Sequence, residues 1–328
     1  MRSALIAGLV AINLSFFTSP LLSGQLSTVA EDAMSAKTLF VGRDSPAYQQ
    51  AKAWRNSRPH EASLMDLLAA QPVAYWFDGI DESTYESVQS VVRAAKRHNS
   101  IPVLVAYNIP ERDCGGYSAG GARSDEGYLA WVGSFATAIA NNEAIIILEP
   151  DALADVRCLS TKAQSRRENL LSQAVSILKQ GSPNASAYID AGNPHWIAAG
   201  EMAIRLQRVG IENAEGFALN VSNFETTQDN MEYGTKISQL LGGKHFVIDT
   251  SRNGLGSNGE WCNPPGRATG EKPTLSTGHP LVDAFLWVKV PGESDGTCHG
   301  GPRAGEWWPD YALGLIERAT GANDVHAP

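Results

Sequence analysis

Residues 144–151 read Ala-Ile-Ile-Ile-Leu-Glu-Pro-Asp, an apolar run that ends directly in two carboxylates. Unbroken hydrophobicity, without alternating polar positions, is typical of a strand buried on both faces of a parallel sheet. Six further runs of this kind occur along the chain, so the sequence predicts seven strands. The other runs are residues 74–80, 102–109, 185–189, 216–221, 245–248 and 284–290.

Helical patterns follow most of these runs. Tyr128, Val132 and Phe135 fall on one helical face, and another helical stretch opens at Thr226 and stops at Gly242. Strands that alternate with helices predict a wound α/β fold, either a barrel or an open sheet. Seven strands without an evident eighth favour a barrel that does not close perfectly.

Length and charge narrow the class of protein. The chain has 328 residues, of which 43% are hydrophobic and 19% charged, as in an ordinary globular protein. No linker, repeat or low-complexity tract divides residues 31–328, so one domain is expected there. The net charge of −9 is badly suited to nucleic acid or to an anionic membrane surface, and it favours a neutral substrate.

Residues 1–30 are predicted to be a signal peptide with a short leader. Arg2 supplies a positive charge, residues 4–22 are mostly apolar, and small residues near Ser23 could support cleavage. Polar residues interrupt the apolar stretch and weaken it as a membrane helix. We therefore expect a secreted protein, with a membrane-anchored form as the alternative if the signal is retained.

The four cysteines predict two disulfides, because an even number is typical of exported proteins. Four thiols allow three pairings, and we favour the neighbours in sequence, Cys114–Cys158 and Cys262–Cys298. By loop closure each bridge would stabilise the fold by about 4 kcal/mol. The cysteines are spaced too widely for a zinc site, and the histidines show no zinc-binding motif, so no metal is expected.

Polar residues stand at the end of nearly every predicted strand. In parallel α/β architectures these ends meet on one face, where ligands bind, so the sequence predicts one polar cleft. Any single Asp or Asn could instead be a turn or capping residue. The strand-end residues include Asp78, Asp113, Glu149, Asp151, Asp190, Asn220, Asp249, Arg252, Lys289, Glu293 and Asp295.

Four segments in this set closely resemble glycoside hydrolase family 6, which contains cellobiohydrolases and endoglucanases. They are residues 107–114 (Tyr-Asn-Ile-Pro-Glu-Arg-Asp-Cys), 147–151 (Ile-Leu-Glu-Pro-Asp), 248–254 and 287–296. The resemblance runs in order from the first strand to the last helix. It implies a distorted parallel β/α barrel and cleavage of β-1,4-glucan with inversion at the anomeric carbon, without a cofactor.

The resemblance also implies roles for individual residues. Asp151 corresponds to the proton donor, Asp113 to the residue that supports the donor and positions or deprotonates water, and Asp295 to the candidate base. Inversion needs such an acid and base on opposite faces of the sugar. The predicted substrate-binding residues are Trp76, Tyr107, Asp190, Trp196, Asn220, Trp261, Lys289 and Glu293.

Two positions depart from the family pattern. Asn193 stands where the family often has His, which suggests a changed subsite. Ala119 stands where a water-positioning Ser is often found, and the adjacent Ser118 is the candidate to replace it.

The length of the last loop bears on the mode of attack. In exo-acting members of the family, two long loops enclose the cleft as a tunnel. Residues 298–308 are too few to form such a cover, so we expect an open cleft and an endoglucanase. An exo-acting cellobiohydrolase and a non-catalytic glucan-binding barrel are the alternatives. No separate carbohydrate-binding module is evident, and we expect a monomer whose partner is a β-1,4-glucan.

Overall fold

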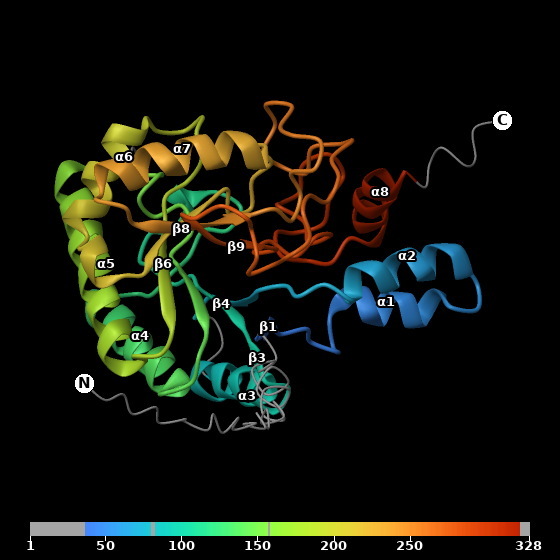
Figure 1. Ribbon diagram of the computed structural model, residues 1–328, viewed down its shortest axis with the longest axis horizontal. Coiled ribbons are helices and arrows are strands. Elements are labelled where there is room, and N and C mark those ends of the chain that lie inside the picture. The colour runs from blue at the N-terminus through green and yellow to red at the C-terminus, as the bar shows by residue number, and fades with distance from the viewer. Residues whose placement is uncertain (1–36, 80–82, 157, 322–328) are drawn as a thin grey trace, which may run out of the picture. The chain divides into compact units, whose positions relative to one another are not determined.

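The structure is a computed structural model that describes residues 37–79, 83–156 and 158–321 (Figure 1). The predicted signal peptide lies outside these ranges. Within them, no helix is both long enough and apolar enough to cross a membrane.

A seven-stranded parallel sheet forms the centre of the described chain, and its strands are hydrogen-bonded in chain order. Every predicted run contributes one strand, which confirms the fold class. The strands are β2 (Tyr75–Phe77), β4 (Val103–Ala106), β5 (Ile145–Leu148), β6 (Ser186–Asp190), β7 (Gly216–Leu219), β8 (His245–Asp249) and β9 (Val282–Leu286).

The last strand departs most from its prediction. The apolar run was expected to pair over residues 284–290, but β9 starts at Val282 and ends at Leu286. The next residues leave the sheet because their backbone has another partner. The amides of Val288 and Lys289 donate to the carboxylate of Asp249 at 3.1 and 3.0 Å.

The curled sheet does not close completely. Its edge strands are β2 and β9, and no strand ladder joins them among the described residues. Single contacts bridge the gap instead: the amide of Ala74 donates to the carbonyl of Trp287 at 3.0 Å, and the Trp76 indole donates to the carbonyl of Val288 at 2.8 Å. This is the imperfect barrel that the count of seven strands predicted.

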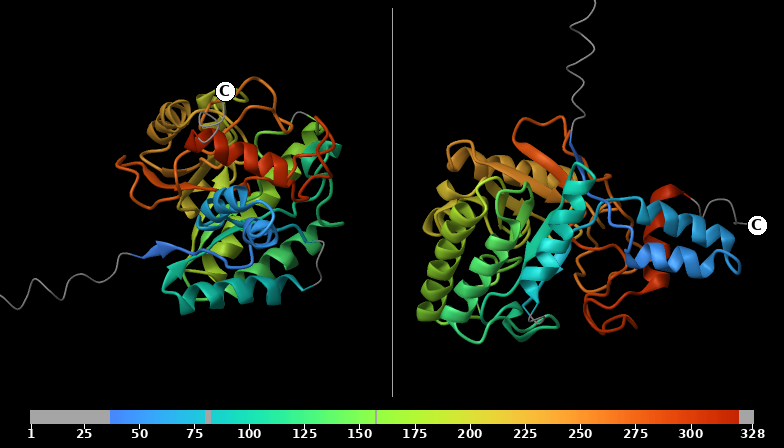
Figure 2. Two further views of the ribbon diagram at one scale, coloured as in Figure 1. Left: turned by 90° about the vertical axis from the view of Figure 1, so that its right-hand side faces the viewer. Right: turned by 90° about the horizontal axis from the view of Figure 1, so that it is seen from below.

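Helices cover the outer face of the sheet (Figures 1 and 2). Alternate strand residues enter two different apolar layers: Leu104 and Ile146 pack outward with the helices, whereas Val105 and Ile147 pack inside the barrel. Because both faces of each strand meet an apolar layer, the strand sequences are largely hydrophobic and do not alternate between apolar and polar positions. The covering helices are α3 (Thr84–Arg97), α4 (Asp125–Ile139), α5 (Thr161–Gly181), α6 (Ala199–Arg208) and α7 (Thr227–Leu240).

The ends of the described chain pack together beside the barrel. Helices α1 (Pro46–Trp54) and α2 (Pro59–Ala69) share an apolar cluster with α8 (Pro309–Thr320), centred on Met65, Trp287 and Ala312. Figure 2 shows the two blue helices against the red one. A short pair, β1 (Thr38–Leu39) with β3 (Ser100–Ile101), and two 3-10 turns, Asp113–Gly115 and Ile211–Asn213, complete the elements.

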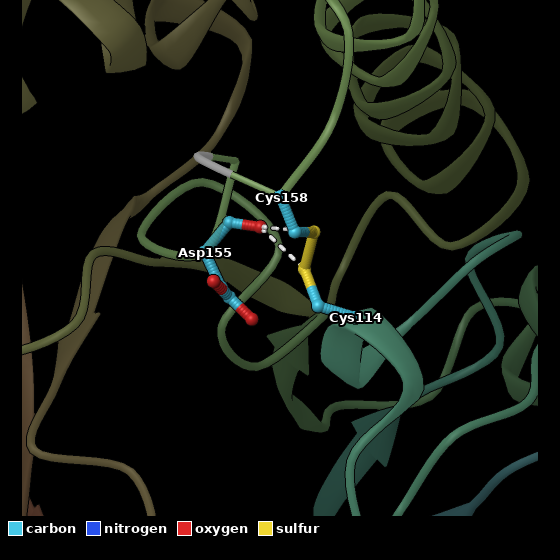
Figure 3. Close-up of side chains that lie close together, drawn as sticks. All are labelled: Cys114, Asp155 and Cys158. Atoms are coloured by element: carbon cyan, nitrogen blue, oxygen red, sulfur yellow. Dashed lines mark hydrogen bonds between the residues drawn. A yellow bond between two sulfur atoms is a disulfide. The ribbon is translucent and has the colours of Figure 1, made fainter.

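Both predicted disulfides are present. Cys114 is bonded to Cys158, and Cys262 to Cys298, with Cα–Cα distances of 6.0 and 6.2 Å. Within the described residues, the one group with metal-ligating side chains is Cys114, Asp155 and Cys158. Its two sulfurs are bonded to each other, and both point at the backbone carbonyl of Asp155 (Figure 3). The disulfide therefore holds the loop after β5 against the loop after β4.

Candidate active site

A cleft of about 720 Å³ lies at the carboxyl ends of the strands. All but two of the residues predicted for catalysis or substrate binding line it, although they come from strand β2 and from the loops after five other strands. Those that line the cleft are Trp76, Tyr107, Asp113, Asp151, Trp196, Trp261, Lys289, Glu293 and Asp295.

Asp190 and Asn220 do not reach the cleft surface. Asp190 is 1% exposed, and its Oδ2 accepts hydrogen bonds from the amides of Asp151 and Gly192 at 2.9 and 3.1 Å. Asn220 is fully buried and is hydrogen-bonded to the backbone of Glu225 and Asp249. Both side chains therefore support the loops of the site from behind.

One wall of the cleft gathers three half-buried carboxylates, Asp113, Asp151 and Asp155. Burial, followed by the negative charges of Asp190, Asp113 and Asp155, raises the pKa of Asp151 well above the usual value for aspartate. These effects favour the neutral form, and among the described residues no cation forms an ion pair with this carboxyl.

Asp113 sits on a tightly folded loop. Its Oδ2 accepts a hydrogen bond from the amide of Ser118 at 2.6 Å, and Arg112 Nε donates to the carbonyl of Ser118 at 2.9 Å. Burial is the main cause that raises the pKa of Asp113, the charge of Asp155 adds to it, and the Ser118 amide opposes it. Ser118 therefore contacts Asp113 through its backbone, while Ala119 also lines the cleft.

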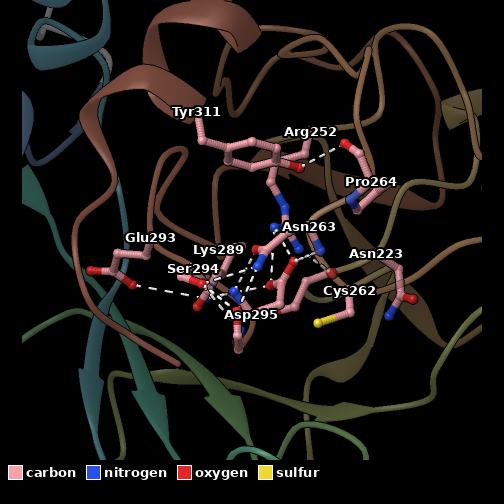
Figure 4. Close-up of polar contacts among 12 residues, drawn as sticks. Asn223, Arg252, Cys262, Asn263, Pro264, Lys289, Glu293, Ser294, Asp295 and Tyr311 are labelled. Carbon is pink, nitrogen blue, oxygen red and sulfur yellow. Dashed lines mark hydrogen bonds and ion pairs between the residues drawn. The ribbon is translucent and has the colours of Figure 1, made fainter. Parts of the chain in front are cut away.

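The other wall holds Asp295 among cations (Figure 4). Its carboxylate oxygens lie 3.0 and 2.8 Å from Arg252 Nη1, 3.0 Å from the amide of Asn263 and 3.7 Å from Lys289 Nζ. Burial would raise the pKa of Asp295, but Arg252 and Lys289 outweigh it, so the pKa is lowered. Asp295 is therefore an ionised carboxylate whose hydrogen-bonding capacity is largely used.

Three other carboxylates at strand ends are ligands of the backbone. Glu149 accepts from the amides of Asn108 and Ile109 at 3.0 Å, and burial raises its pKa to about 7. Asp249 accepts from four amides in the loops after β7, β8 and β9. Together with Asp190, these carboxylates fasten neighbouring loops to one another beyond the ends of the sheet.

Backbone strain is concentrated in the same loops. Glu111, Asp113, Glu149, Asp151 and Asn220 have φ values of 58°, 55°, 49°, 69° and 65°. Residues other than glycine rarely adopt this left-handed region, which costs energy and is enriched at functional sites. The hydrogen bonds and disulfides described above hold these residues in place.

Aromatic side chains line the cleft between the two walls. Trp196 and Trp261 are 38% and 57% exposed, so each presents an open ring face. Trp76 meets Tyr107 edge-on with a centroid distance of 5.5 Å, and the Arg112 guanidinium lies 4.6 Å from the centre of the Tyr107 ring. Burial and the neighbouring Asp151 raise the pKa of Tyr107, so its phenol stays protonated.

Asp155 and Tyr117 are among the cleft residues that the sequence analysis did not predict. A signal for Asp155 exists in the segment Asp-Ala-Leu-Ala-Asp, where the second acid follows Asp151 by four residues. Tyr117 lies in the glycine-rich segment 115–121, and no pattern in the sequence distinguishes it.

A β/α barrel whose open strand ends combine several carboxylates with exposed aromatic rings is an arrangement typical of glycoside hydrolases. Residues 34–319 match the model of the glycosyl hydrolases family 6, and the chain belongs to this family.

Similar proteins agree with this assignment. The chain is 46% identical to endoglucanase A of Cellulomonas fimi, and the match covers 84% of this chain and 60% of that relative. The chain therefore spans less than two thirds of the length of that protein. It is 39% identical to endoglucanase 1 of Streptomyces halstedii over 95% of this chain and 97% of that one. Among solved structures, the chain is similar to the endoglucanase Cel6 from Mycobacterium tuberculosis, whose structure holds methyl-cellobiosyl-4-deoxy-4-thio-β-D-cellobioside. The two structures superpose with a TM-score of 0.83 at 42% sequence identity, and the match covers 87% of this chain and 98% of that one.

Proposed function

We propose that the protein hydrolyses internal β-1,4-glucosidic bonds of cellulose or a related β-glucan with inversion. The observation that carries this proposal is that one cleft holds carboxyls in two different settings. Asp113 and Asp151 form no ion pair with a described residue, whereas Asp295 is paired with Arg252. The similarity to proteins named endoglucanases supports the substrate class.

Asp151 is the proton donor in this proposal. A general acid must be protonated in the free enzyme, and a raised pKa keeps it so toward neutral pH. Asp151 has the raised pKa and faces the cleft, whereas Asp190 behind it binds its backbone amide. Proton transfer to the glycosidic oxygen would let the leaving sugar depart.

Asp113 is the proposed acceptor for the proton of the attacking water, directly or through a second water. Its carboxylate lines the cleft and forms no ion pair with any residue that the structure describes, although the charge of Arg112 lies near enough to lower its pKa. Asp295 is a poorer base because Arg252 and the Asn263 amide already occupy its oxygens. We assign Asp295 the role of an ionised carboxylate that holds Arg252 and Lys289 and places negative charge near the sugar.

The aromatic residues and Lys289 bind the sugar in this proposal. Exposed rings of Trp196 and Trp261 stack on glucosyl units, and Lys289 with Glu293 reaches hydroxyl groups. Asp190 and Asn220 act on binding through the loops that they hold. Asn193, at the position where the family often has His, is 2% exposed and accepts a bond from the His195 amide at 3.0 Å, so it shapes that loop as well.

The last loop supports an open cleft and internal attack. It runs alongside residues 293–294, because the amide of Ser294 donates to the carbonyl of Glu306 and the amide of Gly305 donates to the carbonyl of Ser294, both at 2.9 Å. We expect the viscosity of a soluble cellulose derivative to fall quickly relative to the release of reducing ends. Mainly cellobiose with little loss of viscosity would favour the exo-acting alternative.

The experiment that tests the function is reducing-sugar release from a soluble β-glucan by the wild type and by Asp151→Ala. We expect the variant to lose about 10²–10⁴-fold in kcat, as for loss of a general acid, and to keep its affinity for oligosaccharide. NMR at early times should show the inverted anomer. A wild type that binds glucan without hydrolysing it would instead support the non-catalytic barrel.

We also propose that residues 1–30 direct export and that the mature protein is extracellular. The charge at Arg2, followed by the apolar stretch, supports this. N-terminal sequencing of the protein recovered from culture medium would locate the cleavage site, while recovery only from membranes would indicate a retained anchor.

A further inference from the structure

The loop that carries Asp113 sends one aromatic side chain toward the opposite wall. Tyr117 is 51% exposed and lines the cleft. Its ring lies 6.1 Å from that of Trp261, centroid to centroid, at an interplanar angle of 44°. The two residues belong to different loops, one after β4 and one after β8.

Tyr117 also rests on the residue next to Asp295. A Cβ built at Gly296 would lie 2.5 Å from Cγ and Cδ2 of Tyr117, which is closer than real Cβ contacts occur. Only glycine therefore admits the tyrosine ring at this point. Tyr117 thus connects the wall of Asp113 with the wall of Asp295.

Both ends of this contact are anchored independently. Cys114, three residues before Tyr117, is bonded to Cys158, and the amide of the adjacent Ser118 is bonded to Asp113. On the other side, Trp261 precedes Cys262, which is bonded to Cys298. Each ring is therefore carried by a loop that is tied down close to it, and we expect the side chains to be the parts that open and close.

We propose that Tyr117 and Trp261 form an aromatic clasp that closes over a glucan chain bound between Asp113 and Asp295. This inference rests on the proposed function. An internal segment of a polymer has no nearby end to thread, so it enters a cleft from the side, and the ring of Tyr117 must leave Trp261 to admit it. The ring is half exposed, and its contacts are one aromatic side chain and the backbone at Gly296, so a rotation of the side chain suffices for this.

The chemistry of the ligand fits two facing rings. The faces of a β-1,4-linked glucosyl unit are largely C–H, and aromatic rings offer flat apolar surfaces of matching size. Once the chain is inside, the ring of Tyr117 covers it while Trp261 stacks on it. The clasp thereby supplies a local cover to a cleft whose last loop is too short to roof it.

The test measures binding rather than turnover, in the Asp151→Ala background, by calorimetry with cellotetraose. Replacing Tyr117 by Ala should weaken binding about tenfold, and Tyr117→Phe should bind like the parent because the ring makes the contacts. Tyr48→Ala, which removes an exposed tyrosine on α1 (41% exposed), should leave binding unchanged. Parent-like binding by Tyr117→Ala, or a Phe variant as weak as the Ala variant, would overturn the clasp.

Double-variant cycles separate a clasp from two unrelated contacts. Tyr117→Ala and Trp261→Ala should be non-additive, because each ring acts through the other, whereas Tyr117→Ala and Trp196→Ala should add. Additive losses for the first pair would reject the clasp while leaving the proposed function intact. If cellotetraose binds to no variant and the wild type does not hydrolyse glucan, the proposed function itself fails, and the clasp fails with it.

Discussion

The two walls of the cleft use the same side chain in opposite electrostatic settings. Asp151 is buried among acidic neighbours and forms no ion pair with a described residue, so its neutral form is favoured; Asp295 is buried beside Arg252 and Lys289, so its ionised form is favoured. Residue type and burial alone therefore do not set the state of a carboxyl. The charges that the fold brings within a few ångströms decide it.

The largest expected effect is a loss of kcat, and it tests whether Asp113 or Asp295 is the general base. Asp113→Asn should lower kcat by about 10²–10⁴-fold, as for loss of a general base. A base must be ionised, so activity is lost as pH falls through its pKa. Because the pKa of Asp113 is raised, the acidic limb of the wild-type profile should lie above the ordinary range of aspartate.

The position of the acidic limb in the same pH profile could also contradict the assignment of Asp113 as the base. If Asp295 were the base, its lowered pKa would place the acidic limb below the ordinary range of aspartate. Asp310→Asn, an exposed acid at the start of α8, is the matched control and should change neither kcat nor the profile.

The next effect is on stability and concerns the cationic wall. Arg252 is fully buried and paired with Asp295 at 2.8 Å, so Arg252→Met should lower the free energy of unfolding by about 3–5 kcal/mol. The loss arises because a buried carboxylate is left without its main partner. Urea unfolding followed by tryptophan fluorescence would measure it.

A matched pair of variants sharpens this prediction. Arg252→Met combined with Asp295→Asn should recover part of the stability, because the buried charge is removed as well. Arg55→Met breaks an exposed ion pair with Asp66 and should cost less than about 1 kcal/mol. Equal losses for Arg55 and Arg252 would contradict the contrast between surface and buried pairs.

The smallest effect probes the acidic wall. Asp155 adds negative charge next to Asp151, so Asp155→Asn should make Asp151 ionise more easily. The donor is needed in its protonated form, so the alkaline limb of kcat/KM should move to lower pH. Glu232→Gln, an exposed change on α7, serves as the control, and an unmoved limb for Asp155→Asn would show that this charge does not tune the donor.

The apolar runs were enough to predict seven strands of a wound α/β fold, because each strand is buried on both faces and its sequence is correspondingly largely apolar. The strand count favoured a barrel over an open sheet, and the family resemblance implied the distorted barrel. The strand-end rule likewise brought Asp113, Asp151 and Asp295 to one cleft, since parallel strands end on one side. The rule did not separate these from Glu149, Asp190 and Asp249, because a carboxylate that binds backbone amides and one that faces substrate have the same sequence signature. The helices α1 and α2 were not predicted either: they are stabilised by packing on α8, a contact between the two ends of the described chain.

By itself, the sequence determined the seven strands, the side of the sheet on which the acids gather and the preferred pairing of the cysteines. Those features depend on local pattern and chain order. Only the tertiary structure decided which carboxyls are ionised, which ones fasten loops, and that Tyr117 reaches Trp261 across the cleft. Each of these depends on distances between residues far apart in the chain, because burial and Coulomb interactions act through space.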